Sequence, residues 1–123
     1  MAGLPPAARL RRASDFAALR HAEHWQGRHF LLRWRKASEG NARLGIAVSR
    51  KVSKRAVERN RIKRVVRESF RAEREELSPL DILVIARASA AGTPNPVLFA
   101  DLGLAWRKLK ALKQTPAPGT IGG

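Results

Sequence analysis

The sequence predicts a small α/β sandwich of the α+β class, with about four strands in a mixed sheet and three helices. Stretches with apolar residues at helical spacing alternate along the chain with short stretches in which apolar and polar residues alternate. One later stretch is apolar on both faces, which is typical of a central strand. The 123-residue chain is 44% hydrophobic, which suits one modest core. The expected order is helix, strands, basic helix, strand, helix.

The first predicted elements are a short helix and a strand. Ser14 is a suitable N-cap for a helix over about residues 15–21, and Asp15 favours its first turn. Apolar and polar residues alternate over residues 29–36, which predicts a strand, and residues 21–27 leave room for another short one. The turn signal Glu39-Gly40-Asn41 predicts a hairpin between strand 29–36 and the next strand.

That next strand, over about residues 43–49, has two different faces. Its larger side chains fall on one face and its small ones on the other: Leu44, Ile46 and Val48 against Gly45, Ala47 and Ser49. The small side chains predict a shallow trough on the sheet. Close packing of a helix against them is an equal alternative.

A basic helix is predicted over about residues 56–76, ending before Leu77-Ser78-Pro79. A helical wheel gathers its apolar stripe in one sector: Ile62, Val65, Val66, Ser69 and Phe70. The opposite sector is polar and cationic: Asn60, Arg61, Lys63, Arg64, Arg67 and Arg71. Residues 50–71 hold ten Lys or Arg but only two acids, whereas an ordinary solvated face mixes the two signs. Because like charges one turn apart repel, this row is expected to serve a polyanion.

The remaining chain predicts a buried strand and a last helix. Residues 81–87 are apolar on both faces, so they should form a central strand. After a loop, Asn95 is expected to cap a helix over about residues 97–112. The strands on either side of the basic helix should pair in parallel, and general topology makes such a crossover right-handed. Residues 1–8 and 115–123 are expected to be disordered, which leaves a single domain over 9–114.

Composition restricts the function. The net charge of +15 and the pI near 11.8 point to phosphate-rich partners. The absence of cysteine excludes disulfides and thiolate metal sites. No signal-peptide pattern and no run of 18 apolar residues is evident, so a cytoplasmic protein with no membrane partner is expected. No phosphate loop, HExxH or paired-acid motif is evident either, so no catalytic or metal-binding residue is predicted in the protein.

The basic segment resembles a known signature. Lys51, Arg55, the run Arg59-Asn60-Arg61-Ile62-Lys63-Arg64 and the following Arg67-Glu68-Ser69-Phe70-Arg71 resemble the signature helix of the bacterial ribonuclease P protein subunit. Supporting segments extend the similarity to about residues 9–112: Arg9-Leu10, Asp15-Phe16, Arg28-His29-Phe30, residues 44–49 and residues 81–87.

The resemblance implies a subunit of ribonuclease P that binds a catalytic RNA and the 5′ leader of precursor tRNA, while the RNA, with Mg²⁺, removes the leader. It implies no obligate protein partner, no cofactor stably bound by the protein, and an unusual left-handed crossover around the basic helix. The implied contacts to the catalytic RNA are Lys51, Arg55, Arg59, Asn60, Arg61, Lys63, Arg64 and Arg67. The implied leader-binding cleft contains Arg12, Phe16, Leu31, Arg33, Gly45 and Ala47.

Two positions depart from the family pattern. Family members often carry aromatic residues one turn after Phe16 and at the position of Arg33, whereas this chain has Arg20 and Arg33. Because aromatic stacking contributes about 1–3 kcal/mol per base, leader binding here should depend more on electrostatics. Composition alone leaves open a ribosomal-type RNA-binding protein, a DNA-binding module and a free-standing nuclease. The ordered signature favours the ribonuclease P subunit.

Overall fold

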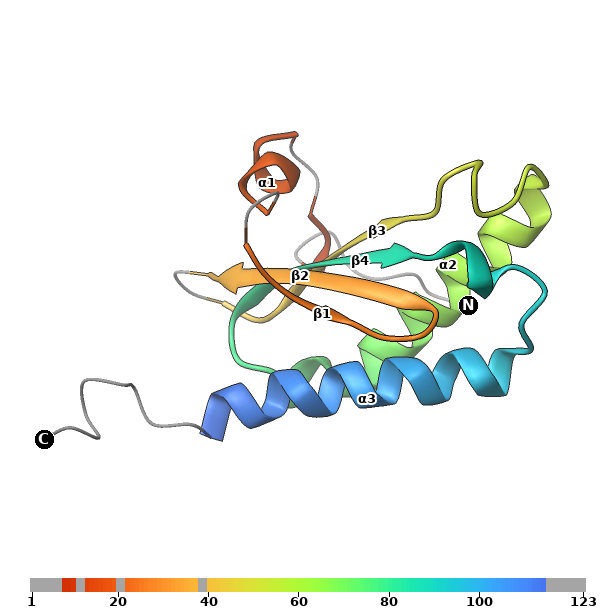
Figure 1. Ribbon diagram of the computed structural model, residues 1–123. Coiled ribbons are helices and arrows are strands. Elements are labelled where there is room, and N and C mark those ends of the chain that lie inside the picture. The colour runs from red at the N-terminus through yellow and green to blue at the C-terminus, as the bar shows by residue number, and fades with distance from the viewer. Residues whose placement is uncertain (1–7, 11–12, 20–21, 38–39, 115–123) are drawn as a thin grey trace, which may run out of the picture.

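The computed structural model describes residues 8–10, 13–19, 22–37 and 40–114, and its elements follow the predicted order (Figure 1). The helix Ala56–Glu73 carries an apolar stripe at helical spacing, and the strand Leu80–Ala86 is almost wholly apolar. Short 3₁₀ turns occupy residues 74–76 and 88–90. The helices and strands are α1 (Ala13–Ala18), β1 (Glu23–Gln26), β2 (Phe30–Lys36), β3 (Arg43–Ala47), α2 (Ala56–Glu73), β4 (Leu80–Ala86) and α3 (Asn95–Gln114).

The four strands form one mixed sheet in the order β1-β2-β4-β3. β1 pairs antiparallel with β2, and β2 pairs antiparallel with β4. β3 pairs parallel with β4, with α2 between them along the chain. The additional short strand and the parallel pair are therefore confirmed, and the handedness of the crossover stays a prediction.

The predicted hairpin between the second and third strands is wrong. β4 lies between β2 and β3, so these two strands do not pair. Gly40, in the predicted turn, has a φ of +84°, which glycine adopts without strain, whereas Glu39 lies outside the described residues. The strand that is apolar on both faces takes a central place, with a neighbouring strand on each of its edges. The hairpin of this sheet is instead β1–β2, closed by a bond from the Gly27 N–H to the Phe30 carbonyl of 2.8 Å.

One face of the sheet packs against α2 and α3, which lie on the side opposite α1 (Figure 1). Alternate residues of the three longer strands point into this core, among them Leu32, Val84 and Leu44. The ring centroids of Trp106 in α3 and Phe70 are 5.8 Å apart, and the indole N–H of Trp106 donates to the Ser69 hydroxyl at 2.7 Å. Ser69, predicted on the apolar stripe, thus satisfies a buried donor.

The ends of the elements differ by a few residues from the predicted ones. α1 begins at Ala13, so Ser14 lies inside the helix and is not its cap. β3 ends at Ala47 rather than at residue 49. Ala8, expected in a disordered segment, is buried in the core. Residues 1–7, 115–123 and His21 lie outside the described part of the chain, so the other predictions for them stay predictions.

Candidate nucleic-acid interface

The cationic face of α2 follows from its apolar stripe. Ile62, Val65, Val66 and Phe70 are buried in the core, so the opposite sector of the helix points away from it. The predicted RNA contacts fall into two groups of equal size. The exposed ones are Lys51, Arg55, Asn60 and Arg64, and the half-buried ones are Arg59, Arg61, Lys63 and Arg67.

Arg61 is engaged within the protein. Its Nε and Nη2 donate to the two carboxylate oxygens of Glu58, each at 2.9 Å. Its Nη1 donates to the Thr93 carbonyl at 2.9 Å and to the Asn95 side-chain oxygen at 2.6 Å. A guanidinium has five N–H donors, so these four bonds leave one for any other partner. Arg61 therefore joins the start of α2 to the loop before α3.

Glu58 completes this connection from the other side. Its second oxygen also accepts the backbone N–H of Gly92 at 2.7 Å. The hydrogen bonds from Arg61 and then from Gly92 lower the pKa of the Glu58 carboxyl from its usual 4.5 to about 2. Arg59 is held less tightly, through one bond from Nη1 to the Ser53 carbonyl at 3.0 Å. The sequence signal for the Arg61 contact was the acid three residues earlier, at helical i,i+3 spacing.

The sheet face on the α1 side carries the predicted cleft residues in two registered rows. The strand pairing sets the rows across β2, β4 and β3 as Arg33–Leu83–Gly45 and Leu31–Ile85–Ala47. Leu31, Arg33, Leu83 and Ile85 are half-buried and Ala47 is exposed. Because α1 leaves Leu31, Leu83 and Ile85 partly exposed, their apolar side chains form a surface on which a flat group can lie.

Phe16 of α1 lies against this face at Gly45. A Cβ atom built on Gly45 would lie 2.7 Å from Cε1 and 3.1 Å from Cζ of the Phe16 ring, so no larger residue fits without moving the ring. Phe16 itself is half-buried. This is the placement that the cleft interpretation requires. Arg12, also predicted in the cleft, and Arg20 lie outside the described residues.

A group of charges that sequence reasoning missed holds α1 to the sheet. Asp81 is 1% exposed and accepts bonds from Arg43 at 2.8 and 2.9 Å and from Arg35 at 3.2 Å. Asp15 of α1 lies 3.6 Å from Arg43 and 3.8 Å from Arg35. Burial opposes ionisation of Asp81, yet the bonds and charges of the two arginines outweigh it and lower its pKa. Strand register places Arg35 and Arg43 opposite Asp81. The sequence feature that points to this group is the acid Asp81 at the beginning of an otherwise apolar strand.

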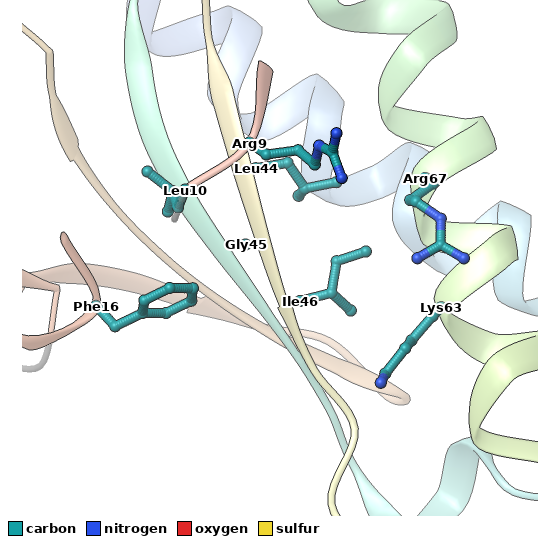
Figure 2. Close-up of a pocket in the computed structure, with 8 residues that line it drawn as sticks. All are labelled: Arg9, Leu10, Phe16, Leu44, Gly45, Ile46, Lys63 and Arg67. Atoms are coloured by element: carbon teal, nitrogen blue, oxygen red, sulfur yellow. The ribbon is translucent and has the colours of Figure 1, made fainter. Parts of the chain in front are cut away.

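A pocket of about 230 Å³ opens at the outer edge of β3. Phe16 and Gly45 line it from the cleft side, and Lys63 and Arg67 line it from α2 (Figure 2). Residues predicted to bind the leader and residues predicted to bind the catalytic RNA therefore meet at β3. This proximity could not be read from the sequence, because it depends on β3 being the edge strand.

In the described part of the chain, no helix is long and apolar enough to cross a membrane. No group of three or more histidine or acidic residues in the same ranges is placed to hold a metal ion.

Comparisons with known proteins identify the family. The sequence model of the family described as ribonuclease P matches residues 4–110. The chain belongs to the ribonuclease P protein family. The ribonuclease P protein component of Thioalkalivibrio sulfidiphilus is 38% identical over 108 residues, which cover 87% of this chain and 90% of that protein.

Solved structures of the family share the fold. The ribonuclease P protein of Staphylococcus aureus superposes with a TM-score of 0.76 at 31% identity, covering 83% of this chain and 96% of that one. The protein from Thermotoga maritima gives 0.71 at 31% identity, covering 84% and 96%. The expected fold class is thus confirmed, and the chain is a protein subunit of ribonuclease P, a ribonucleoprotein that processes tRNA.

Proposed function

We propose that this subunit binds the catalytic RNA through the cationic face of α2 and the 5′ leader of precursor tRNA in the cleft between α1 and the sheet. The observation that carries the proposal is the half-buried Phe16 ring resting on Gly45, beside a pocket that Lys63 and Arg67 also line. An aromatic ring and nearby cations together suit single-stranded RNA, which offers bases for stacking and phosphates for pairing.

The exposed cations suit a larger, structured RNA. Arg55 and Arg64 are exposed at the start and on the outside of α2, and Lys51 is exposed in the segment before the helix. Such a row can neutralise successive phosphates of a folded RNA without reading its bases. Under this proposal, Arg61 contributes mainly by holding the helix in place, because four of its N–H groups are already used.

The proposal assigns phosphodiester hydrolysis to the RNA, and the required Mg²⁺ to sites on the RNA. A surface lined by arginine and lysine repels a divalent cation and attracts phosphate. The protein would then supply binding energy and orientation for the substrate rather than reacting groups. The cytoplasm is the expected location, because precursor tRNA is processed there.

A three-arm cleavage assay tests the proposal. Precursor tRNA is incubated with the protein alone, with a bacterial catalytic RNA alone, and with both at low millimolar Mg²⁺. We expect no cleavage by the protein alone and strong stimulation when both are present. Correctly placed cleavage by the RNA-free protein would contradict the assignment of catalysis. Tight RNA binding without stimulation would favour a purely structural RNA-binding role.

A further inference from the structure

The pocket at the outer edge of β3 carries three cations that come from two distant parts of the chain. Arg9 precedes α1, whereas Lys63 and Arg67 lie one turn apart on α2. Figure 2 shows their side chains around the space beside Ile46. In the described part of the chain, no acidic side chain pairs with any of the three. By contrast, Arg43 pairs with Asp81 and Arg61 pairs with Glu58.

Gathering like charges without an acid costs free energy, because each cation raises the potential at the others. A bound anion would remove this repulsion. The apolar parts of the pocket are Leu10, Leu44 and Ile46, together with the Phe16 ring across the strand. An occupant that matches the whole pocket therefore has one compact negative group and one less polar part.

The backbone of β3 adds a hydrogen-bond donor. The Leu10 N–H bonds to the Leu44 carbonyl at 2.9 Å, which shows that the polar groups of Leu44 point outward from the sheet. Backbone groups alternate in direction along a strand, so the N–H and carbonyl of Ile46 also point outward. The N-terminal segment bridges to this edge of β3 at Leu44, and none of the described residues pairs with Ile46 there.

We propose that this pocket binds one unpaired nucleotide of RNA, with its phosphate between Arg9, Lys63 and Arg67 and its sugar or base against Leu44 and Ile46. A volume of about 230 Å³ is smaller than the sites that hold drug-sized ligands, and it suits one phosphate with its sugar. The inference rests on the proposed function and adds Arg9 to it. It also makes the leader cleft and the basic helix one continuous surface across the edge of β3.

The nucleotide has two possible sources, the leader and the catalytic RNA, and the experiment separates them. Affinities are measured for the catalytic RNA with the protein alone, and for precursor and leaderless tRNA with the reconstituted holoenzyme. The variants are Arg9→Ala, Arg67→Ala and their double variant. Arg64→Ala, on the exposed side of the same helix, is the matched control. Thermal melting checks that each variant is folded.

A charge-assisted hydrogen bond contributes about 1.5–3 kcal/mol, so each single variant should weaken one binding step about tenfold or more. Because Arg9 and Arg67 share one phosphate, the double variant should lose clearly less than the product of the two single losses. The affinity losses from Arg9→Ala and Arg64→Ala should multiply, since Arg9 and Arg64 contact different phosphates. A loss confined to leader-bearing tRNA assigns the nucleotide to the leader, and a loss in the first assay assigns it to the catalytic RNA.

The proposal is overturned if Arg9→Ala leaves all three affinities within twofold of the wild type. It is also overturned if the affinity losses from Arg9→Ala and Arg67→Ala multiply in the double variant, as the losses from Arg9→Ala and Arg64→Ala do. A failure of the proposed function is recognised separately, since the wild-type protein would then not stimulate cleavage at all.

A direct measurement uses nuclear magnetic resonance on the full chain. A single-stranded five-nucleotide RNA should shift the Ile46 amide signal with saturation, and Arg9→Ala should weaken that binding. If inorganic phosphate binds as tightly as the oligonucleotide, the pocket is a simple anion site and the nucleotide proposal is wrong.

Discussion

Replacing Arg61 and Arg64 by alanine separates a cation that supports the fold from one that is free to bind RNA. The two residues are three positions apart on α2, and both belong to its polar sector. Arg61 donates four hydrogen bonds inside the protein, whereas the Arg64 side chain is exposed. A sequence-based interpretation assigns the same role to both.

The size of the effect follows from the contacts of Arg61. Its bidentate pair with Glu58 and its bonds to the Thr93 carbonyl and the Asn95 side chain lie at a partly solvated site, where the Arg61 and Glu58 side chains are 29% and 19% exposed. Hydrogen bonds to charged groups contribute about 1.5–3 kcal/mol when buried, and exposed ion pairs about 0.2–1 kcal/mol. Arg61→Ala should therefore lower the free energy of unfolding by about 1–3 kcal/mol, which is roughly 4–12 °C in Tm. Arg64→Ala should change it by less than about 0.5 kcal/mol.

The assay combines thermal melting with affinity for the catalytic RNA over a range of salt concentrations. Losing one phosphate contact should reduce the slope of log K against log[salt] by about 0.7–0.9. We expect this change for Arg64→Ala and an unchanged slope for Arg61→Ala. Glu58→Gln is the matched control, because it breaks the same ion pair from the other side and should destabilise the protein as Arg61→Ala does. If Glu58 acted only as a surface charge, its removal would leave the stability unchanged and strengthen RNA binding.

The reasoning fails if the pattern is reversed. A stable Arg61→Ala protein with a reduced slope would show that Arg61 contacts phosphate and that its bonds to the loop before α3 are dispensable. A Glu58→Gln protein that keeps its Tm and binds RNA more tightly would lead to the same conclusion.

Three further results are expected. Phe16→Ala should weaken holoenzyme binding of precursor tRNA by about 1–3 kcal/mol and leave leaderless tRNA nearly unchanged; equal loss for both, or a collapse in Tm, would place Phe16 in the core. Val66→Asp should abolish cooperative melting, because it places an unpaired charge at a fully buried site under α2; a cooperative transition near the wild-type Tm would refute the assigned faces of the helix. The Glu58 carboxyl has a pKa lowered from 4.5 to about 2 in the folded protein, so its contribution to stability is complete above pH 4.5 and is lost as the pH falls toward 2. Denaturant titrations of wild type and Glu58→Gln should therefore differ most above pH 4.5 and converge near pH 2, and a constant difference across this range would contradict the assignment.

The periodicity of the sequence was sufficient to predict most elements. The apolar stripe of α2 and the apolar run of β4 are local patterns, and both favour burial in a folded state of this chain. The same patterns indicated which side of α2 is cationic. They did not reveal that β4 inserts between β2 and β3, because the turn at Gly40 looks the same whether or not the strands beside it pair.

The cationic helix, the small residues of β3 and the family resemblance are all properties of the sequence, because they depend on residue type and spacing alone. Which arginines remain available to RNA was decided by the tertiary structure. Arg61 faces a loop 32 residues away in sequence at Thr93, whereas Arg67 faces the open edge of β3. The Asp81 group and the pocket beside Ile46 likewise arise from strand order and register. Long-range pairing sets these contacts, and a pattern of neighbouring residues carries no information about which distant partner a side chain meets.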